Sequence, residues 1–176
     1  FCTNNRQYRI PIALACFISP IVSRMIINDP TVRKMSLNIE DAYGEFNQIV
    51  ELSTGNSVKI DESNFDFFIK AGELLGNKEI IKSAIDWKFS SEELSIENVV
   101  ERVSIITKFK IEHAETVDFL RKNFSEISYD MYEECNYDTI NFICSVPGLE
   151  IESESKLFNF IYQIVTDMGD DYFDLF

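Results

Sequence analysis

Three glutamates recur in the stretch GLEIESESKLFNFIYQIV, residues 148–165, where closely spaced carboxylates raise the question of acid–base or metal chemistry. A catalytic carboxylate pair needs a partly dry cleft that raises the pKa of one member, and nothing in the neighbouring sequence indicates such a cleft. Ser153 is instead a good helix N-cap, and Glu154 then falls in the first turn, at the positive end of the helix dipole. We interpret Glu150, Glu152 and Glu154 as residues that mark the start of a helix and lie on the solvated surface.

The single histidine and the four cysteines are the other residues that could carry catalysis. A cysteine hydrolase needs a histidine beside its thiol and an Asn or Asp that orients the ring, and no local motif supports that arrangement. His113 shares a helical stripe with Val117 and Leu120, so we interpret it as a core or boundary histidine. The cysteines show neither CxxC spacing nor clustered histidines and are interpreted as reduced structural thiols; they are Cys2, Cys16, Cys135 and Cys144.

Motifs for other chemistry are also missing from the sequence. There is no glycine-rich phosphate loop, no G-x-S-x-G and no H-E-x-x-H. We therefore predict no catalytic residues, no cofactor and no metal, and expect a protein that is not an enzyme. An unrecognised hydrolase is kept as a remote alternative.

Charge and hydropathy limit the partners that the chain can have. The net charge is −14, with 10 basic and 11 acidic residues in 1–90 but 6 and 19 in 91–176. Such a surface repels phosphate, so we expect neither nucleic acid nor an anionic membrane as a partner. The apolar run IPIALACFI is too short to span a bilayer, which makes the cytoplasm the default compartment, with the nucleus not excluded. Because the first residue is Phe1, we expect a piece of a longer chain.

The pattern of residues predicts strands near the N-terminus and helices elsewhere. Residues 1–10 are typical of a hairpin around an Asn-Asn turn, and Met35, Leu37 and Ile39 alternate as in a strand. Capping signals predict helix starts at Ser19-Pro20, Asp61, Ser95 and Ser153, and a helix end at Gly76. Apolar spacing predicts a further helix from residue 40. The last helix presents an apolar face of Leu157, Phe158, Ile161, Ile164 and Val165.

The order of these elements resembles a BTB/POZ domain followed by a BACK-type helical segment. The strings that carry the resemblance are YRIPIALACFISPIVSRMI, FNQIVELSTGNSVKI and NFDFFIKAGELLGNKEIIKSAIDWKF in the first part. VVERVSIITKFKIEHAETVDFLRKNFSEI and LEIESESKLFNFIYQIV carry it in the second. The resemblance implies an α+β fold: a BTB/POZ domain over 1–89, with a small sheet surrounded by helices, and an all-α BACK segment over 90–176, truncated at its C-terminus.

The resemblance also implies protein–protein association in place of catalysis. Many BTB–BACK proteins form homodimers and act as adaptors that link a substrate-binding module to a cullin-type ubiquitin ligase. The cullin-contacting loop of the family corresponds here to INDPTVRK, residues 27–34, but this loop lacks the hydrophobic-x-Glu element that adaptors often carry. The candidate partner-binding residues are Pro20, Met25, Ile27, Asn28, Asp29 and Val32. The apolar segment 12–17 supplies the candidate dimer interface, formed by Ile12, Ala13, Cys16 and Phe17.

Two forms of this function stay open. The chain is either the assembly platform of a cullin-type ligase, or a scaffold or oligomerisation module of a larger protein that binds no cullin. The sequence does not identify the substrate or the physiological partner.

Overall fold

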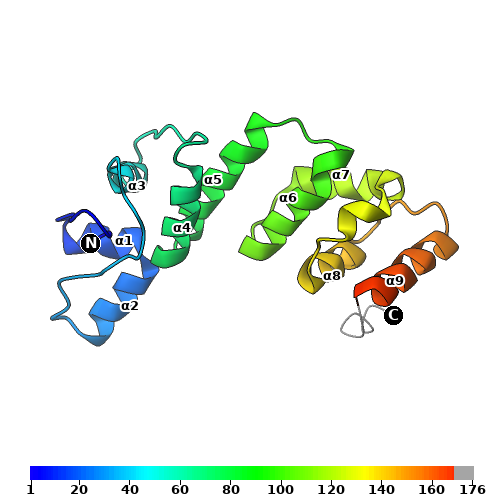
Figure 1. Cartoon of the computed structure of the whole chain (residues 1–176). Helices are drawn as coiled ribbons and strands as arrows, with labels where there is room; N and C mark the ends of the chain where they lie inside the picture. Colours follow the sequence, from blue (N-terminus) through cyan, green and yellow to red (C-terminus); the bar gives the residue numbers. More distant parts are fainter. Residues whose placement is uncertain (169–176) are drawn as a thin grey trace. The chain divides into compact units, whose positions relative to one another are not determined.

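Helices form the framework of the chain in a computed structural model that describes residues 1–168 (Figure 1). The chain divides into two compact units, Phe1–Glu92 and Glu93–Phe176, each with its own hydrophobic core. The first unit contains α1 (Ile12–Ile18), α2 (Pro20–Asn28), α3 (Glu45–Ser53), α4 (Phe65–Leu75) and α5 (Lys78–Ser91). The second contains α6 (Ile96–Phe109), α7 (Ala114–Asn123), the 3₁₀ turns η1 (Phe124–Glu126) and η2 (Tyr129–Tyr132), α8 (Tyr137–Ser145) and α9 (Glu154–Met168). The assignment of 1–89 and 90–176 to BTB-like and BACK-like domains stays a prediction.

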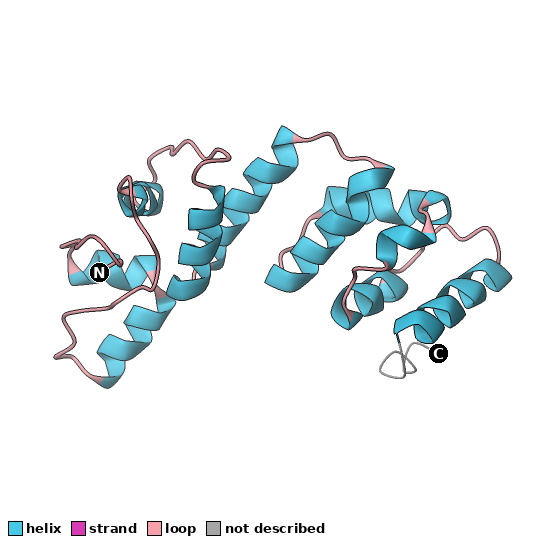
Figure 2. Ribbon diagram, viewed as in Figure 1, coloured by secondary structure: helices cyan, strands magenta, loops and turns pink. Residues whose placement is uncertain are grey.

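The expected α+β fold is wrong, because the described residues contain no sheet. The extended segments near the N-terminus form only two isolated bridges, an antiparallel one between Cys2 and Gln7 and a parallel one between Cys2 and Ser36. Figure 2 accordingly shows helices and loops without a strand in the part of the chain that is described. Residues 1–168 are all-α, and the small sheet that the resemblance implied is not found among them.

The alternation of Met35, Leu37 and Ile39 has a different cause from the one predicted. Leu37 and Ile39 are buried in the core of the N-terminal unit, and the alternating residues Ser36 and Asn38 are exposed. An extended segment that lays one side on a helical core shows this period of two whether or not its backbone is paired. Pairing depends on the neighbouring segment, which bonds this one at Cys2 and Asn4 and then turns away at the bend 4–5.

Four helix boundaries predicted from capping residues are confirmed. Their common basis is local, because a cap is formed by side chains within three or four residues of the helix end. Ser19 caps α2 with Pro20 as the first helical residue, Gly76 ends α4 at φ 66°, Ser95 forms a capping box with Asn98, and Ser153 accepts a hydrogen bond from the Lys156 N–H at the start of α9.

Two other predicted helix starts lie too early in the sequence. The helix expected from residue 40 begins at Glu45, because Gly44 in front of it has a φ of 84°. Asp61 caps a turn, in which it accepts hydrogen bonds from Ser63, and Asn64 is the residue that precedes α4. Asp favours both turns and helix starts, which explains the error at Asp61.

The two helical hairpins of the N-terminal unit, α1–α2 and α4–α5, are joined at their corners by two reciprocal hydrogen bonds. Ser19, between α1 and α2, donates from its hydroxyl to the carbonyl of Leu75 at the end of α4, at 2.8 Å. Asn77, between α4 and α5, donates from Nδ2 to the carbonyl of Ile18 at the end of α1, also at 2.8 Å. Each side chain also accepts a backbone N–H of the helix that follows it. One side chain per corner thus begins a helix and holds the opposite corner.

Close packing at this junction depends on Gly76. Its φ of 66° is one that L side chains rarely adopt, and a Cβ at this position would lie 3.0 Å from Cγ1 of Ile21 in α2. The core around the junction consists of large side chains that are almost fully buried, among them Ile18, Phe46, Ile49, Phe68 and Leu75.

Aromatic contacts organise the core of the C-terminal unit. The ring of Phe160 in α9 packs edge-on against Tyr132 and Phe124, with centroid separations of 4.8 and 5.3 Å. The apolar face predicted for α9 is confirmed at Ile164 and Val165, which are buried, and is wrong at Phe158, which is exposed. The face that meets the core therefore includes Phe160, which was not predicted, and leaves out Phe158.

The corner hydrogen bonds make a testable prediction for stability. Ser19→Ala and Asn77→Ala each remove a helix cap and leave a carbonyl of the other corner without its donor. Each should lower the free energy of unfolding of the N-terminal unit by about 1 to 3 kcal/mol. Urea denaturation monitored by fluorescence reports on this unit alone, because the single tryptophan, Trp87, lies in α5.

Ser90→Ala is the matched control for these variants. The Ser90 hydroxyl is exposed and donates only to the carbonyl of Trp87 in its own helix, so the change should stay within about 0.5 kcal/mol. Equal losses of unfolding free energy in Ser19→Ala and Ser90→Ala would contradict the conclusion that the corner hydrogen bonds stabilise this unit.

Candidate interaction surface

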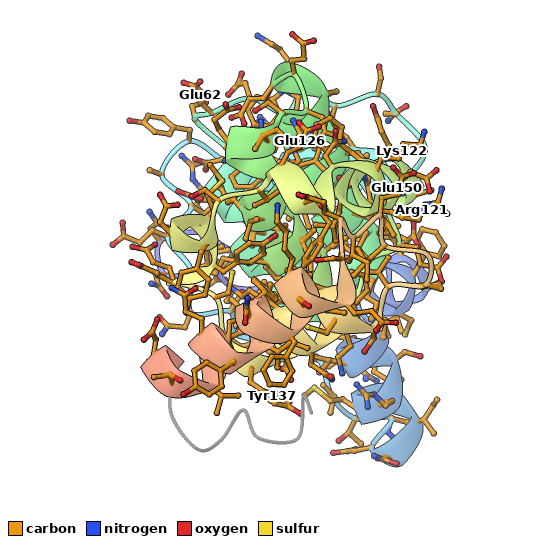
Figure 3. The ribbon with its side chains drawn as sticks, turned by 90° about the vertical axis from the view of Figure 1, so that its right-hand side faces the viewer. Glu62, Arg121, Lys122, Glu126, Tyr137 and Glu150 are labelled. Atoms are coloured by element: carbon orange, nitrogen blue, oxygen red, sulfur yellow. The ribbon has the colours of Figure 1, made fainter. Side chains whose placement is uncertain are left out.

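The glutamates that open the question of catalysis lie on the surface of the C-terminal unit. Glu152 pairs with Lys156, and the N–H of Glu150 donates to the carbonyl of Arg121 at 2.8 Å, so that Glu150 lies beside Arg121 in Figure 3. Glu154 occupies the first turn of α9. Exposure and basic neighbours are the opposite of the dry cleft that a carboxylate pair requires. Their positions agree with the interpretation that these glutamates mark a helix start and lie on the surface.

His113 is the N-cap of α7. Its Nδ1 accepts the backbone N–H of Thr116 at 3.2 Å and lies 2.8 Å from the hydroxyl of the same residue. The predicted place on the stripe of Val117 and Leu120 is wrong by one position, since His113 precedes the helix. In this role the ring nitrogen satisfies a backbone donor at the start of the helix.

The thiols of the C-terminal unit are poorly placed for nucleophilic chemistry. Burial raises the pKa of the Cys144 thiol to about 11 and also raises the pKa of Cys135, against a hydrogen bond with Ser104. A thiol with a raised pKa stays protonated near neutral pH and is a weak nucleophile. Within residues 1–168, no set of three or more metal-ligating side chains is placed to hold a metal ion. The helices of that part of the chain are also too short or too polar to cross a membrane.

Large exposed apolar side chains gather on the α1–α2 hairpin. Four of the seven found in the described residues lie there: Ile12 is 49% exposed, Phe17 68%, Met25 36% and Ile27 76%. Single exposed apolar residues are ordinary on protein surfaces, but a concentration on one hairpin is typical of an interaction site. We call these four side chains the hairpin surface.

The residues predicted to bind partners or form a dimer all lie on this hairpin or its following loop. Of the predicted partner-binding set, Pro20, Asn28 and Asp29 are exposed like Met25 and Ile27, and Val32 is half-buried. Of the predicted dimer set, Ala13 is exposed like Ile12 and Phe17, and Cys16 is half-buried. Their assignment to a partner or to a dimer stays a prediction.

Four of these residues border two depressions of the N-terminal unit. Phe17 and Pro20 border a depression of about 620 Å³ together with Leu52 and Ile80. Ile12 and Val32 border a separate cavity of about 210 Å³. One residue of each predicted set therefore contributes to each site, so the structure does not divide the surface as the sequence did.

The smaller cavity, which we call the basic groove, has apolar walls and a basic rim. Its walls come from α1, α2 and the two extended segments 8–10 and 32–35, and in Figure 1 the N-terminal segment lies against α1. Three of its lining residues are basic and none is acidic. The full lining is Phe1, Tyr8, Arg9, Ile10, Ile12, Ala15, Val22, Ile26, Val32, Arg33, Lys34 and Met35.

A buried carboxylate holds one wall of the basic groove in place. Asp41 accepts a hydrogen bond from the hydroxyl of Tyr8 and more distant ones, at 3.5 Å, from the Thr3 hydroxyl and the Phe46 N–H. Burial works to raise the pKa of Asp41, but hydrogen bonding with Tyr8, Glu45 and the Phe46 N–H outweighs it and the pKa is lowered. Burial and the same hydrogen bond raise the pKa of Tyr8, which keeps the phenol protonated as a donor.

Sequence reasoning missed Tyr8, Arg9, Lys34 and Asp41. One signal was available: residues 1–39 contain five basic residues and one acidic residue, a net of +4, whereas residues 40–176 have a net of −18. Counting the charges separately in 1–90 and 91–176 combined the basic residues 1–39 with the acidic residues that follow, so the change of sign near residue 40 was not seen. The contact between Tyr8 and Asp41 spans 33 positions and leaves no periodic trace in the sequence.

Comparison of the chain with models of known protein families and with curated proteins gives no match. The function must therefore be argued from the geometry of the N-terminal unit.

The Asp41 network predicts a specific response to acid. A carboxyl whose native pKa is lowered contributes stability above its unfolded pKa, near 3.8, and loses that stability as the pH falls through the native value. Tyr8→Phe removes a hydrogen bond to the charged carboxylate. It should lower the free energy of unfolding near neutral pH by about 1 to 3 kcal/mol, and acid unfolding followed by Trp87 fluorescence should begin at a higher pH.

Tyr43→Phe is the control for this experiment, because the Tyr43 side chain is 91% exposed. The difference in the free energy of unfolding between Tyr8→Phe and the parent chain should become smaller at a pH where Asp41 is protonated in both. Coincident acid transitions for Tyr8→Phe and Tyr43→Phe would contradict the role given to this hydrogen bond.

Proposed function

We propose that the chain is a non-catalytic protein-interaction module that self-associates through the hairpin surface. The observation that carries this proposal is Phe17, a large aromatic side chain that is 68% exposed beside an apolar-bordered depression. Burial of aromatic anchors against a complementary surface supplies much of the energy of protein association. Ile12, Met25 and Ile27 add apolar area on the same pair of helices.

The resemblance to BTB–BACK proteins gives this module two possible settings. As an adaptor it would bind a cullin through α2 and the loop 27–34, and as a scaffold it would bind no cullin. The scaffold form has more support, because the loop lacks a glutamate and its Asp29 side chain is engaged with Thr31 at 2.6 and 2.9 Å. The four cysteines are free thiols, which supports action in the cytoplasm.

Self-association is tested by sedimentation velocity of the chain between about 1 and 100 µM. The parent chain should show a concentration-dependent dimer, and Phe17→Ser should shift it to monomer by at least about tenfold in dissociation constant. Tyr43→Ser removes an even more exposed aromatic from the same unit and should leave the dimer unchanged. A parent chain that stays monomeric throughout the range would overturn the proposal.

Calorimetric titration with a cullin N-terminal domain separates the two settings. We expect no heat of binding from this chain under conditions in which a known adaptor binds. Binding at micromolar affinity that is lost in Ile27→Ser would instead establish the adaptor form.

A further inference from the structure

We infer that the basic groove of the N-terminal unit is a binding site for an acidic peptide segment that carries one apolar anchor residue, supplied by a partner protein. This inference deepens the proposed function and rests on it. It concerns Arg9, Lys34 and the cavity between them. Of the four residues of the hairpin surface, only Ile12 lines this cavity.

The size of the groove fits a single side chain. At about 210 Å³ the cavity is smaller than the pockets of about 300 to 1,000 Å³ that hold whole small-molecule ligands. Its walls are mostly aliphatic and aromatic, so the portion of a ligand that enters it must be apolar. Anchor residues of peptides are held in pockets of this kind, while the rest of the peptide lies on the rim.

The charge of the rim determines the charge of the ligand. Arg9, Arg33 and Lys34 border the groove without a carboxylate among its lining residues, in a chain whose net charge is −14. Arg9 and Lys34 form no ion pair with any residue in the described part of the chain. The Arg33 guanidinium is held against the loop by the carbonyls of Pro30 and Val32. Acidic residues on both sides of the anchor would complement this rim and speed association.

Backbone groups beside the groove favour a peptide over other acidic ligands. Arg9 and Lys34 lie in the two extended segments that form its walls, and their N–H groups donate no hydrogen bond within the described residues. Extended segments with unpaired backbone groups can pair with an added strand of a ligand. A fatty acid would fill the cavity and meet the cations but would leave these groups without partners.

The test uses fluorescence anisotropy with the whole chain and a labelled peptide in which glutamates and aspartates flank a central Leu-Phe pair. Arg9→Glu combined with Lys34→Glu should weaken binding by at least about tenfold. Raising the salt concentration from about 50 to about 300 mM should weaken binding of the parent chain as well. Arg24→Glu is the matched control, since Arg24 is an exposed basic residue of α2 that does not line the groove.

Two further comparisons distinguish the contribution of the apolar anchor to binding from the contribution of charge. A peptide of the same charge with Ser-Ser in place of Leu-Phe should bind at least about tenfold more weakly. Ala15→Phe places a ring in the groove and should block the peptide while leaving Trp87 fluorescence unfolding cooperative.

Three results of the binding experiments would overturn the inference, and one result of sedimentation would do so as well. The three are equal binding of the Leu-Phe and Ser-Ser peptides, unchanged binding by the Arg9→Glu, Lys34→Glu chain, and binding of oleate in the groove without binding of the peptide. Loss of self-association in the charge-reversed chain would assign the groove to a second copy and would also overturn it. The proposed function fails separately, through the Phe17→Ser experiment, because Phe17 does not line the groove.

Discussion

The reciprocal capping of two helix corners by Ser19 and Asn77 is the constraint on which the N-terminal unit depends. Each side chain satisfies a backbone donor of its own helix and a carbonyl of the opposite corner, and the Ser19 side chain does so fully buried. A small all-α unit without a sheet has few ways to fix the angle between helical hairpins, since apolar packing has little directional preference. Hydrogen bonds at the corners supply that direction, and they determine where α1 and α2 present Phe17 and Ile27.

Side-chain hydrogen bonds also hold the N-terminal segment in place, where a sheet had been expected to do so. The N-terminal segment forms backbone hydrogen bonds with residues 35–39 through Cys2 and Asn4, and the side chains of Arg6 and Tyr8 bind it to Asp41 and its neighbour. The Arg6 side chain donates to the carbonyls of Asp41 and Ala42 at 2.8 Å. Side-chain anchoring leaves the extended segments open at their outer edges, and this openness gives the basic groove both its shape and its unpaired donors.

The sequence predicts what is local and misses what is distant. Ser19, Gly76, Ser95 and Ser153 marked helix ends correctly because a cap acts within one turn of the helix. Leu37 and Ile39 were misread because one-sided burial and strand pairing produce the same alternation. Ile12 and Phe17 were found through the apolar run 12–17, and Met25 and Ile27 through the family resemblance. The groove was missed because its two extended walls, 8–10 and 32–35, are more than 20 residues apart in the sequence. The charge reversal at residue 40 was the one sequence signal that pointed to it.

The start of α6 has a consequence for how the C-terminal unit sets its own boundary. Ser95 and Asn98 form their capping box within a single turn, and Asn98 also bonds the carbonyl of Glu93, so nothing from α5 is required to begin the helix. The two hydrophobic cores share no residue. Because Glu93, Ser95 and Asn98 supply these bonds, the register of α6 is set within the first residues of its own unit, and a change of sequence before Glu93 leaves the capping box in place.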